Sequence, residues 1–97
     1  MLNSRQRAQL RGMANGFETI FQIGKAGIND QLIKAVDEAL EARELIKLRI
    51  LETSPTDVRT TAETIANAVK ADVVQVIGSR FIIYRESKDN KTIKLVK

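Results

Sequence analysis

The stretch from Ile20 to Asp30 constrains the fold more than any other, because two glycines bracket a lysine where a strand meets a helix. A short apolar run is followed by Gly24-Lys25-Ala26-Gly27 and then by a residue suited to capping a helix. Glycine permits positive φ and close approach of another backbone. The helix that follows directs its free N–H groups toward the turn, and Lys25 adds a full charge. The stretch therefore favours an anion as ligand, and phosphate has the right size.

The same glycine pair also fits a purely structural turn, so two interpretations are open. Two well-known phosphate loops are excluded. A Walker A loop requires glycine where Thr19 stands and Ser or Thr where Ala26 stands. The dinucleotide-binding pattern requires glycine two positions before Gly24, and the chain has Gln22 there. The turn is a candidate anion site of another kind.

Missing residue types argue against several classes of function. The 97 residues include no histidine and no cysteine. The chain therefore lacks the usual residue for general acid–base catalysis, and it lacks the residues that form thiol nucleophiles, disulfides and most transition-metal sites. With 43% hydrophobic residues, the chain is expected to form one globular domain over 1–97. No apolar run reaches the roughly 20 residues of a membrane span. These features predict a cytoplasmic protein that is not an enzyme and uses no cofactor or metal.

Positive charge gathers toward both ends of the chain. Residues 1–27 have a net charge of +3, residues 28–72 of −3 and residues 73–97 of +4. Such a distribution can reflect ordinary solvated faces. If the two ends are neighbours in space, it instead predicts a one-sided basic surface for a polyanion.

The first predicted helix spans residues 4–15. Asn3 can cap it, and Gln6 stands where a capping box needs its partner. Gly16 supplies the stop. Arg7 and Arg11 are four residues apart and share a face. The predicted buried stripe consists of Leu10, Met13, Ala14 and Phe17.

Alternating apolar stretches and helical stripes predict the remaining elements. In the strand over 45–51, Lys47 and Arg49 alternate with apolar residues, which predicts one buried and one water-facing side. Phe81 and Tyr84 are interpreted as core rather than as stacking aromatics. The other expected elements are a strand over 19–23, a helix over 30–42 capped by Asn29, a helix over 56–70 begun by Ser54-Pro55 or Thr56, strands over 73–77 and 80–85 joined by Gly78-Ser79, and a possible edge strand over 92–96 in the basic tail 86–97.

The predicted order is α-β-α-β-α-β-β. A helix between consecutive strands implies right-handed parallel crossovers, and the final hairpin adds an antiparallel pair. The expected fold class is therefore α/β, a compact single domain with a mixed sheet of about four strands packed against helices.

This order and these residues resemble one family, the bacterial YhbY-like single-domain proteins of the chloroplast RNA splicing and ribosome maturation (CRM) domain family. The similarity runs over nearly the whole chain, and residues beyond Arg85 match least. It is carried by Arg5-Gln6-Arg7, Leu10-Arg11, Phe21-Gln22-Ile23-Gly24-Lys25-Ala26-Gly27-Ile28, Glu44-Leu45-Ile46-Lys47, Val74-Gln75-Val76-Ile77-Gly78 and Ile83-Tyr84-Arg85.

The resemblance implies an RNA-binding domain whose fold is similar to the C-terminal domain of a bacterial translation initiation factor. Stand-alone bacterial members of the family are associated with precursors of the large ribosomal subunit. The expected partner is thus ribosomal RNA, with ribosomal proteins or assembly factors as further partners, and the chain is expected to be a monomer. The family's Gly-x-x-Gly loop, taken as an RNA contact, falls on Gly24 to Gly27.

The resulting hypothesis is non-catalytic recognition of the RNA backbone. The loop would contact phosphate, and arginines of the first helix would flank it. One alternative is a protein-interaction module whose sheet face, with Lys47 and Arg49, docks on an acidic partner such as a ribosomal protein or assembly GTPase. The other is an enzyme that binds a small nucleotide or anion, which the missing residue types disfavour. The candidate RNA-binding residues are Gly24, Lys25, Ala26, Gly27, Ile28, Arg5, Arg7 and Arg11, with Arg80, Arg85 and Lys88 as weaker candidates.

Overall fold

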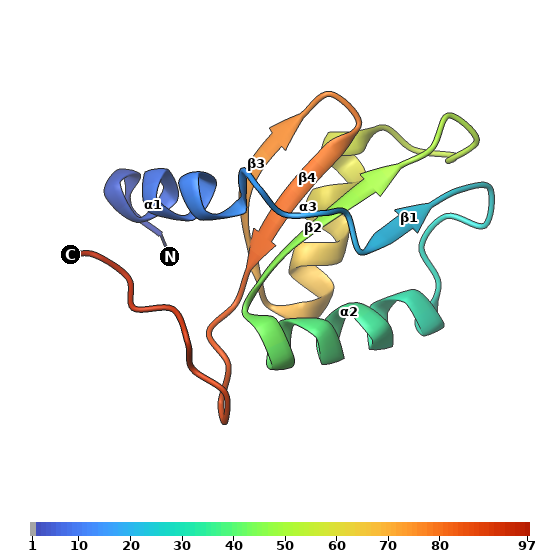
Figure 1. Ribbon diagram of the computed structural model, residues 1–97. Coiled ribbons are helices and arrows are strands. Elements are labelled where there is room, and N and C mark those ends of the chain that lie inside the picture. Colours follow the sequence, from blue (N-terminus) through green and yellow to red (C-terminus); the bar gives the residue numbers. More distant parts are fainter. Residues whose placement is uncertain (1) are drawn as a thin grey trace.

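The helices and strands follow the predicted order. The structure is a computed structural model that describes residues 2–97 (Figure 1). Three helices precede the first three strands in turn, and a fourth strand completes the sheet. The elements are α1 (Ser4–Ala14), β1 (Phe21–Ile23), α2 (Asp30–Arg43), β2 (Leu45–Ile50), α3 (Val58–Val69), β3 (Asp72–Ile77) and β4 (Arg80–Tyr84).

The four strands form one mixed sheet in the order β1-β2-β4-β3, which confirms the predicted fold class. Strands β1 and β2 are parallel, whereas β4 is antiparallel to both β2 and β3. The hairpin strand β4 thus lies between β2 and β3, two strands that run in the same direction. The crossover through α3 skips one position in the sheet, and β4 fills it.

Helices α2 and α3 cover one face of the sheet and bury the main core. Alternate residues of the strands point to this face, as the two-residue period of a strand requires. Phe81 and Leu48 are among the largest side chains buried there. The buried residues of this core are Ile23, Val36, Leu40, Ile46, Leu48, Ala62, Ile65, Ala66, Val69, Phe81 and Ile83.

Helix α1 covers part of the opposite face. A second apolar cluster there joins Leu10 and Ala14 of α1 to Leu45, Ile82 and other strand residues. The prediction that this face is water-facing is therefore wrong where α1 packs on it, because Leu45, Ile82 and Tyr84 are buried there. Lys47 and Arg49 lie on the remaining part and are only partly exposed.

The predicted stripe of α1 is correct in its first half only. Leu10 and Ala14 are fully buried, but Met13 and Phe17 are each 40% exposed. The reason for Phe17 is that α1 ends at Ala14, and the chain then turns with the Phe17 N–H donating to the Ala14 carbonyl at 2.9 Å. Phe17 therefore no longer follows the helical period.

Side-chain caps begin all three helices. Asn3 and Gln6 form the predicted capping box, and Asn29 caps α2 by accepting from the Leu32 N–H at 2.8 Å. The predicted start of α3 is wrong. Asp57, not Ser54 or Thr56, is the cap, and its carboxylate accepts from the Thr60 N–H at 2.7 Å.

The β3–β4 hairpin turns at Gly78, whose φ is +57°. Positive φ at the first of two loop residues is what the Gly78-Ser79 sequence predicts. Phe81 and Tyr84 are 1% and 4% exposed, so their interpretation as core residues is confirmed and neither can stack on a ligand.

The segment 86–97 forms no strand, so the predicted edge strand over 92–96 is wrong. Side chains of α1 bind its backbone instead. Gln6 donates to the Val96 carbonyl at 2.9 Å, and Gln9 both donates to the Lys94 carbonyl and accepts from the Val96 N–H. The two ends of the chain are therefore neighbours, as a joint basic surface requires.

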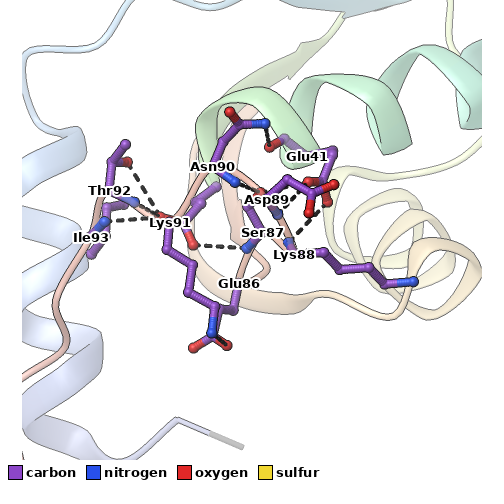
Figure 2. Close-up of polar contacts among 10 residues, drawn as sticks. Glu41, Glu86, Ser87, Lys88, Asp89, Asn90, Lys91, Thr92 and Ile93 are labelled. Carbon is purple, nitrogen blue, oxygen red and sulfur yellow. Dashed lines mark hydrogen bonds and ion pairs between the residues drawn. The ribbon is translucent and has the colours of Figure 1, made fainter.

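Two glutamates anchor the start of this segment, Glu41 in the last turn of α2 and Glu44 directly after that helix. Figure 2 shows the contacts of Glu41. Glu41 accepts hydrogen bonds from the Ser87 hydroxyl at 2.7 Å and from the Lys88 and Asp89 N–H groups. Glu44, which is fully buried, accepts from the N–H groups of Ser87, Thr92 and Ile93 at 2.7 to 2.9 Å.

These hydrogen bonds stabilise the ionised carboxylates. The Ser87 hydroxyl, followed by the Asp89 and Lys88 N–H groups, lowers the pKa of Glu41 to about 2. Burial opposes ionisation of Glu44, but its backbone donors outweigh that effect and also lower the pKa of this carboxyl.

We expect acid to release the segment 86–97. Glu41 has a reference pKa of 4.5 and a folded pKa of about 2, so its contribution is complete above pH 4.5 and is lost as pH falls through about 2. Glu41→Gln should accelerate amide hydrogen exchange at Lys88 and Asp89 at pH 7, and this difference from the wild type should shrink toward pH 2. Glu38→Gln, on an exposed position of the same helix, is the control. Equal exchange in wild type and Glu41→Gln at pH 7 would contradict the account.

Candidate functional site

The glycine turn connects β1 to α2 at one end of the sheet. The Gly27 N–H donates to the Gly24 carbonyl at 2.9 Å and closes the turn. Gly27 has φ of +66°, a conformation that favours glycine, whereas Gly24 does not have positive φ. Lys25 and Ala26 at the tip are exposed. The turn thus presents a lysine and its backbone to solvent.

The loop after β2, which contains Thr53 and Pro55, packs against the glycine turn. The Leu51 N–H donates to the Ile23 carbonyl at 2.8 Å just before the turn begins. A side chain at Gly24 would lie 3.3 Å from Oγ1 of Thr53, and one at Gly27 would lie 3.0 Å from Cγ of Pro55. The space that the glycines leave is therefore occupied by this loop. The structural interpretation of the glycines accounts for both positions.

The backbone of the turn still offers hydrogen-bond donors to a ligand. The Gly27 N–H is used within the turn, so it is not one of them. In the part of the chain that the structure describes, the N–H groups of Ala26 and Ile28 have no hydrogen-bond partner. Both lie just before α2, where the helix dipole adds positive potential. Lys25 forms no ion pair within residues 2–97. An anion at this tip would meet these two donors and one cation, with Asp30 as the acidic residue nearest in sequence.

The arginines of α1 do not flank the turn. Figure 1 shows α1 (blue) and the β1–α2 turn (cyan) at opposite ends of the molecule. Arg5 and Arg11 are exposed, and the Arg7 guanidinium donates to the Val73 carbonyl of β3. The predicted grouping of these arginines with the glycine turn is wrong, because α1 packs on the far end of the sheet.

The three weaker candidates for RNA binding, Arg80, Arg85 and Lys88, lie in different parts of the molecule. Arg85 pairs with Asp37 and donates to the Val69 carbonyl at 2.9 Å, so its guanidinium joins β4 to α2 and α3. Lys88 is exposed in the segment held by Glu41. Arg80 is exposed beside the hairpin turn, close to the end of β2.

Arg80 is the candidate nearest to the glycine turn across the sheet. The end of β2 lies between them, because the Ile50 N–H donates to the Ser79 carbonyl and the Leu51 N–H to the Ile23 carbonyl, both at 2.8 Å. Neighbouring strands lie about 4.8 Å apart, so the backbone of Arg80 lies roughly 10 Å from that of Gln22, which precedes the glycine turn in β1. Arg49 belongs to this group too, since it is the register partner of both Gln22 and Arg80. The sequence signals this position of Arg49, because charged and apolar residues alternate over 45–51 and place Arg49 on the face opposite the main core.

Within residues 2–97, no cluster of three acidic side chains is placed to hold a metal ion. The helices described here are all too short or too polar to cross a membrane.

Comparisons with known proteins identify the family and match the fold. Residues 2–85 match the model of the CRS1 / YhbY (CRM) domain family. The chain is 44% identical to the Bacillus subtilis protein named Probable RNA-binding protein YqeI, over 98% of this chain and 99% of that protein. It is 30% identical to a Haemophilus influenzae protein named RNA-binding protein, over 93% and 91%. The solution structure of the hypothetical protein SAV1595 from Staphylococcus aureus matches with a TM-score of 0.82 and 49% identity, covering 99% of this chain and all of that one.

We expect Gly27→Ala to destabilise the protein by about 1–2 kcal/mol, because alanine disfavours positive φ and its Cβ would press on Pro55. Gly12→Ala is the matched control. Gly12 lies inside α1 with nothing within 4 Å of the new Cβ, so this change should stabilise by roughly 0.5–1 kcal/mol. Urea unfolding measures both. Equal effects of the two substitutions would show that the turn imposes no special backbone requirement.

Proposed function

The chain belongs to the CRS1 / YhbY (CRM) domain family, and on this basis we propose that it is a non-catalytic RNA-binding protein that contacts ribosomal RNA through its glycine turn. Two relatives that align over more than 90% of the chain carry RNA-binding in their names. One structural observation supports the turn as the contact. Lys25 stands exposed and without an ion partner in the described chain, beside two unpaired backbone N–H groups at the start of α2.

The proposed chemistry is recognition of a phosphate. The N–H groups of Ala26 and Ile28 donate to its oxygens, and Lys25 neutralises its charge. Gly24 and Gly27 hold the backbone in the shape that exposes these donors, while their missing side chains make room for Thr53 and Pro55. Such a contact positions RNA without reading its sequence.

The basic residues outside the turn form two proposed sets. Arg80 lies on the same end of the sheet as the turn and would hold a neighbouring phosphate. Arg5, Arg11 and Lys88 would contact a separate part of a larger RNA. Arg7 and Arg85 are engaged by the protein itself, so we assign them the role of holding β3 and β4 in place.

In the cell, we propose that the protein acts on precursors of the large ribosomal subunit in the cytoplasm. A folded RNA of that size offers both a local phosphate for the turn and distant phosphates for the other basic set. Recognition by shape and backbone is the usual mode for structured RNA.

We expect Lys25→Asn to weaken binding to ribosomal RNA fragments several-fold, whatever their sequence, and to reduce the slope of log affinity against log salt by roughly 0.7–0.9, the share of one phosphate. Lys70→Asn is the matched control. This substitution removes one exposed charge at the C-terminal end of α3, away from the glycine turn. Asparagine tolerates the left-handed conformation of Lys70, whose φ is +59°.

Fluorescence anisotropy at several salt concentrations provides both numbers, and thermal unfolding verifies that the variants are folded. If the two variants bind alike, the turn is not a phosphate contact. If the wild type binds no RNA at any salt concentration, the proposed function fails.

A further inference from the structure

The open part of the sheet face beside α1 carries three cations that form no ion pair among the described residues. Lys47, Arg49 and Arg80 all lie on this face, as their register shows. None of them is within 4 Å of a carboxylate oxygen among residues 2–97, although Glu52 and Asp57 lie in the hollow next to Arg49. The face therefore has net positive charge in the free protein.

The arrangement of these cations costs stability. Arg49 and Arg80 are direct cross-strand partners, and like charges in that position repel. Nε of Arg49 is buried and has no hydrogen-bond partner in the structure. A buried donor without a partner is unfavourable, because it has lost its hydrogen bonds to water. An anionic ligand would relieve the repulsion between the two guanidinium groups.

Two hollows on this face share Lys47. The first, of about 250 Å³, contains Lys47 and Arg80, the amide side chains of Asn15 and Gln75, and the apolar side chains of Ile77 and Ile82. It is smaller than the roughly 300–1,000 Å³ of sites for drug-sized molecules. No acidic side chain lines it. Amides beside an apolar floor and two cations suit one nucleotide of an RNA strand, because each amide carries both donors and an acceptor for a base edge.

The second hollow, of about 560 Å³, adds an exposed aromatic ring. Phe17 lines it together with Lys47, Arg43, Glu18 and Ile20. Phe17 is 40% exposed in the connection from α1 to β1, which crosses the front of the sheet in Figure 1. Unpaired bases stack on such rings, whereas bases within a duplex cannot reach them. The side chains that line this hollow have a net positive charge, because Arg43 and Lys47 are cations and Glu18 is the acidic residue among them.

We propose that this face, which we call the Lys47 track, binds an unpaired stretch of RNA. Phe17 stacks on one base, Lys47 and Arg80 hold the adjoining phosphates, and Asn15 and Gln75 hydrogen-bond the edge of the next base. The inference rests on the proposed RNA-binding function and adds a place where base identity is read, which the glycine turn lacks.

The test compares variants for binding of eight-residue oligonucleotides of uridine, adenosine, cytidine or guanosine. Phe17→Leu should weaken binding of the oligonucleotide with the highest affinity by roughly 5–100-fold, the range expected for the loss of one stacked base. Met13→Leu is the control, since Met13 is equally exposed at 40% but lines neither hollow. Arg80→Gln should reduce the salt slope by roughly 0.7. Gln75→Met should change the ranking of the four oligonucleotides while leaving the slope unchanged.

Wild-type NMR provides an independent readout that needs no variant to fold. The best oligonucleotide should shift the amide signals of residues 16–18 and 47 and the side-chain amide of Gln75. Shifts confined to residues 24–28 would overturn the Lys47 track and leave the proposed function intact. Absence of any binding, even by structured ribosomal RNA, would overturn both. Poly-glutamate that shifts the same signals and displaces the oligonucleotides at equal charge concentration would overturn the proposal in favour of an acidic protein partner.

Discussion

The short length of α1 determines which surfaces of this protein are available. Eleven residues of helix span about 16 Å, and α1 packs with only Leu10 and Ala14 fully buried. The sheet is four strands wide, and α2 with α3 covers its other face completely enough to bury eleven core residues. What α1 leaves uncovered lies toward the glycine turn. Arg80 of β4 is exposed there, and Lys47 and Arg49 of β2 are partly exposed, because no helix reaches them.

The glycine turn has a structural role that is consistent with the phosphate contact that we propose for it. Its glycines are needed because Thr53 and Pro55 of the next loop occupy the space behind them. That loop packs against the turn, and the N–H groups of Ala26 and Ile28 have no hydrogen-bond partner among the described residues. A preorganised donor pair loses less entropy when a phosphate arrives. The structural interpretation and the phosphate interpretation are therefore compatible.

Much of the fold follows from local patterns. Asn3 and Asn29 identify two helix starts, the Gly78-Ser79 pair identifies the hairpin, and the alternation around Lys47 identifies β2. The errors have one local and one long-range cause. Phe17 leaves the apolar stripe because α1 ends at Ala14, three residues earlier. The 92–96 stretch is no strand because Glu44 and Gln9 bind its backbone from positions more than forty residues away. Hydrophobic periodicity signals neither the end of the helix nor these distant hydrogen bonds.

The candidate site, like the fold, could be predicted from the sequence only where it depends on a local pattern. The turn at Gly24–Gly27 is a local pattern, and its position before α2 could be inferred from the sequence. Which cations accompany it depends on the packing of α1 and on the strand order, and the sequence alone wrongly favoured the α1 arginines over Arg80. The most direct test is photo-crosslinking of the protein to ribosomal RNA in cells, with the attached peptides identified by mass spectrometry. We expect adducts within residues 16–28 and 47–49. Adducts restricted to the outer surfaces of α2 and α3 would contradict it.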